Sequence, residues 1–495
     1  MKLLKPTIAY IIGFALSGTV CAQIAVPNNG FEQKDPASDT QTAFWKAEND
    51  QFLCKTDNKE FFKGKYSLKL ESNTEGHHFF NQEFPFKSHG LRKFKLSCAV
   101  KTKDLDGSII LGARLFDNTG ALLPKMLFKL TETKNQDWTL AEGFFVAEKE
   151  AAKIRIFGDL LGTGTAWIDE ISVEELPEPT KAPSVETAMY IHEYFDIVYE
   201  NSIITDKSFI AGIKSKTMQL CGDNTSKNEC RYILQYFTTS KLNDKHSFFT
   251  TPEEWKNMVE GGKHPGTGEN LHNFPTGKML DNSIAYLSLP MFVSSDPDLL
   301  AKYADTLQTL ISSFDKQETK GWIIDLSQDM GGNCFPMIAG IGPLIGNGVC
   351  EHSFSGNGTV RQLIYNDGWT GTAWIGGDSS LVFMKSNPYQ LKYKNKPIAV
   401  IYGNNTASSG EVTALALIGL PHTKSFGQET YGVSTRVDNF ELSDGSYLNL
   451  ASGIDADRNK NKYGGKIKPD VETKDTETAI RAAVKWILEK RTDSR

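Results

Sequence analysis

Two segments in the second half of the chain combine a largely apolar run, a short polar turn and a helix-like pattern. Residues 397–402 are apolar, and helical spacing begins after Ser408. Residues 321–326 are apolar except for Asp325, and they lead to Gly331 and Gly332. Apolar runs of this length are typical of parallel strands that are buried on both faces. Because parallel strands end at one edge of a sheet, the pattern predicts an α/β core in which both turns lie at that edge.

The position of Ser408 suits nucleophilic chemistry. A serine at the start of a helix lies among unpaired backbone N–H groups and at the positive end of the helix dipole. Such an environment favours a serine nucleophile and the oxyanion that it generates. Paired glycines such as Gly331 and Gly332 let a backbone N–H approach a ligand closely, so the second turn supplies a candidate oxyanion donor. An N-cap serine in an ordinary strand-to-helix turn is the alternative interpretation.

These two motifs resemble those of the tail-specific (C-terminal-processing) serine proteases and their tricorn-core relatives. Residues 406–411, TASSGE, match the family's T-A-S-x-[SG]-E nucleophile pattern without substitution. Residues 325–332, DLSQDMGG, follow D-L-R-x-N-x-G-G, except that Ser327 replaces the arginine and Asp329 replaces the asparagine. With further landmarks towards the C-terminus, the resemblance covers residues 185–490 and implies an α/β protease core of the ClpP/crotonase-like type.

The resemblance also implies roles for individual residues. The family's nucleophile falls on Ser408, and its oxyanion donors fall on the backbone N–H groups of Gly332 and Ser409. In the members that use a serine–lysine mechanism, a lysine after the last glycine of a downstream motif is the general base. Val433 occupies that position here and cannot accept a proton.

The tricorn-like branch uses a histidine as the base, and residues 244–247, DKHS, resemble its D-x-H-[ST] segment. His246 is therefore the candidate base, and the ordinary pKa of histidine, near 6.5, predicts an acid limb of the pH–rate profile near pH 6–7. A structural histidine is the alternative. Asp455 and Asp457 are candidates for the acid that orients the imidazole, and both are equally explained as turn residues.

The first part of the chain has the pattern of antiparallel strands. Residues 66–70 and 94–101 alternate apolar and polar side chains, which is typical of half-buried strands. We therefore predict a jelly-roll-like antiparallel β-sandwich over residues 24–175. Residues 29–32 and 166–171 resemble parts of galactose-binding-like modules, many of which bind carbohydrate. A glycan is thus a candidate partner, and simple packing beside an enzyme is the alternative.

Composition shifts divide the chain into five segments. These are a signal peptide at 1–22, the sandwich at 24–175, a proline-rich linker at 176–184, a helical subdomain at 185–260 and the α/β core at 280–490. Only a short glycine-rich stretch separates His246 from the next strand. This gap is too small for the PDZ module of many tail-specific proteases, so substrate capture must be organised differently.

Composition and charge agree with an exported enzyme. The 495 residues carry a net charge of −6, which gives no sign of nucleic-acid binding. Residues 2–16 contain two lysines and then an apolar stretch, and a Val-Cys-Ala site follows at 20–22, as in a signal peptide. We expect a periplasmic or extracellular protein without an integral membrane span. Residues 18–20 form a poor lipobox, so a lipoprotein is not expected.

Cysteine usage bears on the redox compartment and on metal binding. Removal of the signal peptide leaves Cys54, Cys98, Cys221, Cys230, Cys334 and Cys350. Sequence proximity favours the pairs Cys221–Cys230 and Cys334–Cys350, with Cys54–Cys98 left over, and buried free thiols are the alternative. The sequence contains no CxxC motif, HExxH motif or His/Cys cluster, so we expect no metal and no other cofactor.

Together with these patterns, the resemblance implies an exported serine peptidase that cleaves a peptide or protein substrate through an acyl-enzyme. One alternative is a non-catalytic ligand- or peptide-binding protein on the same fold, which Ser327, Asp329 and Val433 favour. The other is a glycan-associated protein whose sandwich domain carries the function.

Overall fold

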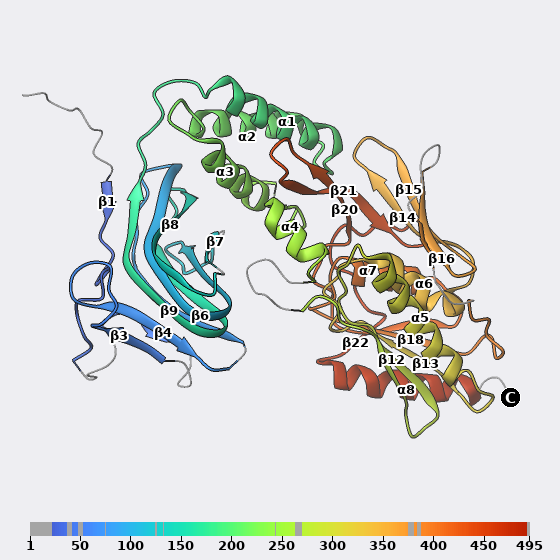
Figure 1. Cartoon of the computed structure of the whole chain (residues 1–495). Coiled ribbons are helices and arrows are strands. Elements are labelled where there is room, and N and C mark those ends of the chain that lie inside the picture. The colour runs from blue at the N-terminus through green and yellow to red at the C-terminus, as the bar shows by residue number, and fades with distance from the viewer. Residues whose placement is uncertain are drawn as a thin grey trace, which may run out of the picture.

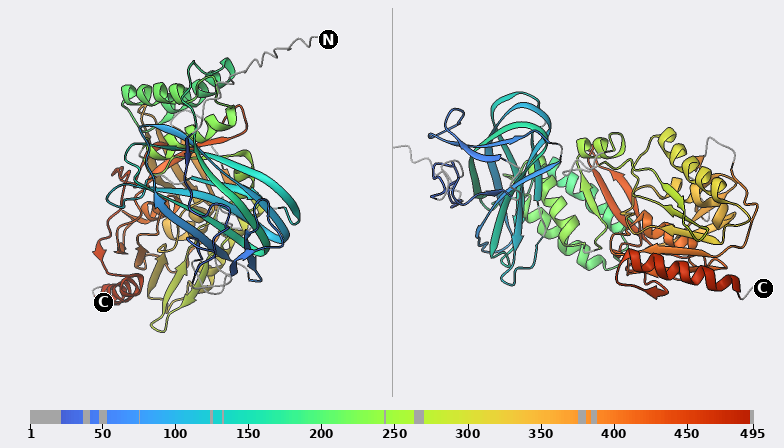
Figure 2. Two further views of the ribbon diagram at one scale, coloured as in Figure 1. Left: turned by 90° about the vertical axis from the view of Figure 1, so that its left-hand side faces the viewer. Right: turned by 90° about the horizontal axis from the view of Figure 1, so that it is seen from below.

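The computed structural model describes residues 22–36, 42–47, 53–74, 76–123, 126–131, 133–242, 244–262, 270–374, 381–383 and 388–492. Apart from its last residue, the signal peptide predicted for residues 1–22 lies outside these ranges. Figures 1 and 2 show three parts in a row: a curled β-sandwich, a group of helices and an α/β core.

The sandwich is a nine-stranded antiparallel sheet that curls on itself (Figure 1). Its strands are β1 (Ala22–Ile24), β2 (Lys46–Ala47), β3 (Leu53–Asp57), β4 (Ser67–Ser72), β5 (His77–Pro85), β6 (Arg92–Phe116), β7 (Met126–Thr131), β8 (Gln136–Ala147) and β9 (Lys153–Glu175). The long strands β6 and β9 pair with each other, and their register shifts between Lys103 and Asp106. Because such irregularities bend a strand, one sheet can close around an apolar core that includes Phe31, Phe80 and Phe94.

Helices connect the sandwich to the α/β core. They are α1 (Val185–Asn201), α2 (Lys207–Leu220), α3 (Lys227–Ser240) and α4 (Pro252–Val259). Helix α1 begins at a capping serine, Ser184, and α3 begins with a capping box between Ser226 and Glu229. The buried faces of α1 to α3 share one apolar cluster with Leu448 and Leu450, so the helices are packed against the antiparallel sheet of the core, which is described below.

The centre of the α/β core is a six-stranded sheet in the order β11-β12-β13-β18-β19-β22. The strands are β11 (Thr276–Met279), β12 (Ile284–Ser288), β13 (Gly321–Asp325), β18 (Ile398–Tyr402), β19 (Thr423–Gly427) and β22 (Val471–Glu472). All neighbours pair in parallel except β11 with β12. Strands β13 and β18 are adjacent, so the two turns that follow them lie at the same edge of the sheet.

Helices cover the faces of this sheet. They are α5 (Pro297–Phe314), α6 (Cys334–Ile345), α7 (Ser409–Leu417) and α8 (Thr476–Thr492). Helices α5, α6 and α7 share an apolar cluster with Leu287, Ile324 and Val400, whereas α8 packs against Ile323 and Ile401. Since neighbouring strand residues point to opposite faces, α8 lies on the other side of the sheet from the first three helices.

A second, seven-stranded antiparallel sheet completes the core. Its strands are β10 (Phe248–Thr250), β14 (Gly348–Ser355), β15 (Val360–Asn366), β16 (Trp369–Trp374), β17 (Leu381–Phe383), β20 (Thr435–Glu441) and β21 (Tyr447–Ala456). Strand β21 pairs with β10, β14 and β20. The sandwich and the parallel core confirm the predicted fold class, but the sequence patterns did not predict this second sheet.

None of the described cysteines forms a disulfide. Cys350 is buried, and its thiol contacts the carbonyl oxygen of Gly348 rather than Cys334, so the structure does not contain the predicted Cys334–Cys350 bridge. The Cys54–Cys98 pair involves a side chain outside the described part of the chain. Only the thiols of Cys221 and Cys230 meet among the described cysteines, at an Sγ–Sγ distance of 2.8 Å.

We predict that Cys221 and Cys230 form a disulfide under oxidising conditions. The two sulfurs need to move by less than about 1 Å to reach bonding distance, and the short loop should add about 2–3 kcal/mol to the free energy of unfolding. Non-reducing peptide mapping should recover the two peptides joined, with Cys334 and Cys350 open to alkylation. Recovery of alkylated Cys221 and Cys230 from protein kept under oxidising conditions would contradict this.

Candidate active site

Ser408 lies at the bend between β18 and α7. Its backbone has φ +52° and ψ −117°, a left-handed conformation that is costly for a residue with a side chain, on the order of 1–3 kcal/mol. The bend is fixed by Thr406, whose hydroxyl donates to the carbonyl of Leu326 at 2.8 Å, and by Ala407, whose N–H donates to the carbonyl of Asp329 at 3.0 Å. These two bonds join the Ser408 turn to the turn that follows β13.

Glu411 holds the first turn of α7 in place. Its side chain is fully buried and accepts hydrogen bonds from the N–H groups of Ser408 at 3.0 Å and Val433 at 2.9 Å, and from the Thr430 hydroxyl at 2.5 Å. Burial raises the pKa of Glu411, and these donors oppose that rise. No role was predicted for Glu411 from the sequence. Its position three residues after a helix-capping serine is that of the acid in a capping box, and this could have indicated its contact with the turn. The side chain of Val433 is buried, and Val433 contributes to this turn only through its backbone N–H, which donates to Glu411.

His246 is brought to Ser408 by a loop that precedes β10. The imidazole Nε2 lies 2.9 Å from the Ser408 Oγ. Asp244 shapes the loop, because one carboxylate oxygen accepts the N–H groups of His246 at 2.9 Å and Ser247 at 2.6 Å. The Ser247 hydroxyl in turn accepts the N–H of Ala451 in β21 at 2.9 Å. The loop is thereby attached to the second sheet.

Thr435, at the start of β20, is the partner of the other imidazole nitrogen. Its Oγ1 lies 2.7 Å from Nδ1 of His246. If Nδ1–H donates to this hydroxyl, Nε2 carries the lone pair and can accept the hydroxyl proton of Ser408. Thr435 was not predicted from the sequence, because a lone threonine at the start of a strand gives no local signal for such a role.

The two acids predicted to orient the imidazole do not contact it. Asp455 follows Ile454, which pairs with Thr435, so the Asp455 side chain points to the opposite face of β21 and is buried near Ser353. The carboxylate of Asp457 instead closes its own turn by accepting N–H groups from Asn459 and Asn461. The prediction of an orienting acid at either position was therefore wrong.

Burial also changes the acid–base behaviour expected of His246. Desolvation lowers its pKa to about 4, although the negative charge of Asp244 partly opposes this shift. The imidazole is consequently neutral, and able to accept a proton, well below the range expected from the sequence.

We therefore predict that the acid limb of kcat/KM, which reports ionisation of the free enzyme, lies near the lowered pKa of His246 and not near pH 6–7. At pH 5.5, kcat/KM for a peptide should remain within about twofold of its value at pH 7, whereas a pKa of 6.5 would reduce the neutral fraction to about a tenth. Over the same interval the unfolded chain binds more protons than the native state, so His246 makes stability rise with pH. Circular dichroism at each pH separates loss of fold from loss of activity, and a limb at pH 6–7 would contradict the lowered pKa.

The turn after β13 runs against Ser408. Gly331 has φ +110°, and a Cβ there would lie 2.8 Å from the Cβ of Ser408. Gly332 has φ +112°, and a Cβ there would lie 2.1 Å from the carbonyl oxygen of Phe292, so both positions require glycine. The hydroxyl of Ser409 donates to the carbonyl of Gly332 at 2.7 Å, which ties this turn to the first residue of α7.

The N–H groups of Gly332 and Ser409 are the two candidate oxyanion donors. Ser409 is the first residue of α7, where an N–H has no acceptor within its own helix. Within the described part of the chain, neither of these N–H groups has a hydrogen-bond acceptor. The arrangement thus offers two unused donors beside a serine that touches a neutral imidazole, which is the geometry of acyl transfer.

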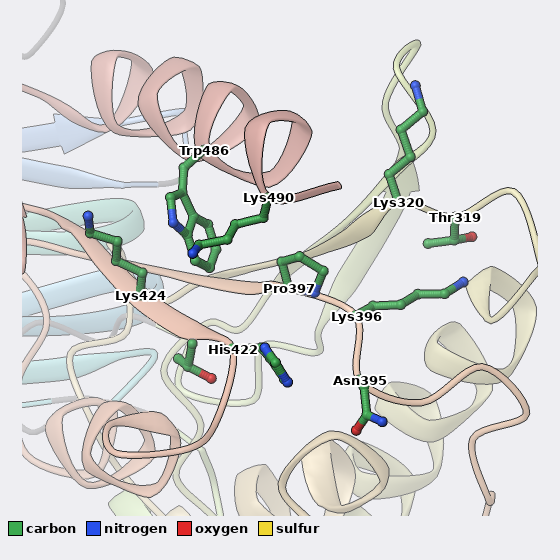
Figure 3. Close-up of a pocket in the computed structure, with 10 residues that line it drawn as sticks. Thr319, Lys320, Asn395, Lys396, Pro397, His422, Lys424, Trp486 and Lys490 are labelled. Atoms are coloured by element: carbon green, nitrogen blue, oxygen red, sulfur yellow. The ribbon is translucent and has the colours of Figure 1, made fainter. Parts of the chain in front are cut away.

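A separate cavity of about 580 Å³ opens at the opposite, amino edge of the parallel sheet (Figure 3). Lys320, Lys396, Lys424 and Lys490 are among its lining residues, and none of the site residues above takes part. Figure 3 shows that these lysines extend in different directions and do not converge on a common point. This cavity is not part of the candidate active site.

No group of three or more His, Cys, Asp or Glu side chains among the described residues is arranged to hold a metal ion. Nor does any helix in the described ranges have the length and apolar character needed to cross a membrane.

Comparison with known proteins supports a peptidase function. Residues 283–473 match the model of peptidase family S41, a range that includes Ser408 and the turn at Gly331 but not His246. A nisin-resistance protein from Lactococcus lactis subsp. lactis is 31% identical over 209 residues, which are 42% of this chain and 61% of that protein. The chain thus spans about three fifths of the length of this curated relative.

Two solved structures are also similar. A lipoprotein from Streptococcus agalactiae aligns over 64% of this chain and 98% of its own, with 25% identity and a TM-score of 0.49. A xylan-binding domain from Paenibacillus barcinonensis aligns over 30% of this chain and 91% of its own, with 15% identity and a TM-score of 0.23. The family resemblance predicted from the motifs is confirmed: residues 283–473 are a domain of peptidase family S41, the family of the C-terminal-processing proteases.

Proposed function

We propose that the chain is an exported serine peptidase in which Ser408 is the nucleophile and His246 is the general base. The observation that most supports this is the 2.9 Å contact between Nε2 of His246 and Oγ of Ser408, in a strained turn at a helix start. Export is part of the proposal because of the charged and then apolar pattern of residues 1–22. The substrate class is a peptide or protein, as expected for a member of a peptidase family.

The proposed reaction proceeds through an acyl-enzyme. Ser408 Oγ attacks the carbonyl carbon of the scissile peptide bond while its proton moves to Nε2 of His246. The carbonyl oxygen becomes an oxyanion that accepts the N–H groups of Gly332 and Ser409. When the C–N bond breaks, the imidazolium of His246 returns the proton to the leaving amine. Water then attacks the ester by the same route and releases Ser408.

Thr435 takes the place of an orienting acid in this proposal. In this proposal the Thr435 hydroxyl accepts the Nδ1–H of His246, which leaves the lone pair on Nε2, but it adds no negative charge to stabilise the imidazolium. The carboxylate of Asp244 bonds to the backbone N–H of His246, and its charge acts on the imidazole without a hydrogen bond to the ring. The base is therefore weaker in its free state than an imidazole paired with a carboxylate, which agrees with its lowered pKa.

Labelling with a fluorophosphonate, followed by peptide mapping, tests the proposal directly. The probe phosphonylates an activated serine, so the label should appear on the peptide that contains Ser408 and should be absent from Ser408→Ala. A matched Ser409→Ala variant should still be labelled. No label on correctly folded protein, together with no hydrolysis of a peptide library, would favour the non-catalytic binding protein instead.

A second candidate function is glycan binding by the sandwich. Phe61 and Phe62 are 41% and 45% exposed, and the Phe62 ring lies 5.9 Å from that of Trp138. Exposed aromatic faces of this kind are apolar surfaces on which sugar rings can stack. Pull-down of the full chain on insoluble polysaccharides should fall in Phe62→Ala and Trp138→Ala but not in Met189→Ala, which removes an exposed side chain of α1. Equal retention of all variants would exclude this surface.

A further inference from the structure

Asp329 is a buried carboxyl in the turn that carries the candidate oxyanion donor. Its side chain is completely inaccessible, and one oxygen, Oδ1, accepts the N–H of Gly331 at 3.0 Å. The other oxygen, Oδ2, has no hydrogen-bond partner within the described part of the chain. No cation among the described residues pairs with this carboxyl. The mechanism proposed above gives Asp329 no task.

The elements packed around Asp329 supply no compensating charge. Helix α7 contributes Gly410, where a Cβ would lie 3.0 Å from the Asp329 carboxyl carbon. The positive end of the α7 dipole is near, but the N–H of Gly410 donates to Ala407. Helix α5 contributes Tyr303, whose hydroxyl donates to the carbonyl of Pro290 at 3.2 Å. The carboxyl of Glu411 bonds to Ser408 and Thr430 and not to Asp329.

The balance of costs favours a neutral acid at this position. An ionised carboxyl would bury a charge with one oxygen unpaired, whereas a protonated carboxyl would leave a single hydroxyl unpaired, which costs far less. Burial raises the pKa of Asp329 well above its ordinary value, and the bond from Gly331 only partly opposes this. The family pattern quoted above has asparagine here, which is a neutral isostere of the protonated acid.

We propose that Asp329 is protonated at neutral pH and acts as a positioning residue of the oxyanion turn. By accepting the N–H of Gly331, the neutral carboxyl orients the turn so that the next N–H, that of Gly332, remains available for the oxyanion. This inference rests on the proposed peptidase function. Ionisation of Asp329 would place a buried negative charge beside the turn that binds the oxyanion, which is itself negatively charged. Activity is therefore lost at alkaline pH when Asp329 loses its proton.

The pH profile of Asp329→Asn tests the inference. At pH 7 its kcat/KM should stay within about threefold of the wild type, because the amide oxygen still accepts the N–H of Gly331. The wild-type profile should fall at alkaline pH, and that of Asp329→Asn should remain flat to higher pH. Asp325→Asn is the matched control, since Asp325 is a buried carboxyl at the end of β13 with both oxygens bonded, and it should keep the wild-type alkaline limb. Superimposable profiles of Asp329→Asn and the wild type would overturn the inference.

A thermal measurement separates this inference from the proposed function. Because the pKa of Asp329 is higher in the folded than in the unfolded chain, rising pH removes the proton from the unfolded chain first and lowers wild-type stability. The asparagine variant has no ionisable group at this position, so it does not lose stability in this way. Its Tm should therefore exceed that of the wild type by a margin that grows as pH rises above about 4, the ordinary pKa of an aspartate side chain. A margin that does not change with pH would overturn the inference even if hydrolysis is normal. If the Tm difference grows with pH but no peptide is hydrolysed, the result supports a protonated Asp329 and contradicts only the peptidase proposal.

Discussion

Replacing Ser408 by alanine should reduce kcat for peptide hydrolysis by about 10⁴-fold or more, as removal of a catalytic-triad member does. The hydroxyl is the group 2.9 Å from His246, and the neighbouring residues of α7 do not offer another hydroxyl to the imidazole. The fold should persist, because a serine-to-alanine change at a helix start costs only ~1 kcal/mol. The measurement is single-turnover hydrolysis with circular dichroism on the same samples.

Ser409→Ala is the matched control for this prediction. It keeps the backbone N–H that the oxyanion would use, but it loses the hydroxyl bond to the carbonyl of Gly332. One hydrogen bond of this type is worth about 0.5–1.5 kcal/mol, so we expect a loss of at most about tenfold. If Ser409→Ala is the more damaging change, the nucleophile is Ser409. If neither variant is affected, the observed hydrolysis comes from another site.

The parts of the site that are local in sequence could be predicted from it. Each of the turns at Ser408 and Gly332 follows a strand that is buried on both faces, and such strands have an unmistakable apolar pattern. Parallel strands end at the same edge, so the pattern predicted that both turns lie there, and the pairing of β13 with β18 brings them together. His246 was found only through the resemblance, because nothing in its local sequence shows that it reaches a serine 162 residues away.

What the sequence could not predict depends on long-range pairing. Thr435 contacts His246 because both β10 and β20 pair with β21, and the strand register decides which face each side chain occupies. The same register turns Asp455 to the opposite face of β21, which is why this carboxylate was the wrong choice. The lowered pKa of His246 has a similar origin, since desolvation comes from the surroundings of a side chain and not from its own sequence neighbours.

Loss of the base should be as damaging as loss of the nucleophile. His246→Ala should lower kcat by about 10⁴-fold, because no other described group that can accept a proton contacts Ser408 Oγ. His422→Ala is the control: it removes an exposed histidine that lines the distant cavity and should leave kcat within about twofold of the wild type, as for most surface changes. Wild-type activity in His246→Ala would mean that another group takes the proton.

Thr435→Val tests whether the Thr435 hydroxyl orients His246, since the variant keeps the imidazole itself. Valine has the shape of threonine but cannot accept the Nδ1–H of His246, and an unpaired buried N–H costs about 1–3 kcal/mol. That cost favours the tautomer with the proton on Nε2, in which the imidazole cannot take the proton of Ser408. We therefore expect kcat to fall roughly 10- to 100-fold, less than in His246→Ala, with KM unchanged. Thr435→Ser should restore most of the activity, because it returns the hydroxyl. Full activity in Thr435→Val would mean that the loop held by Asp244 orients the imidazole without help.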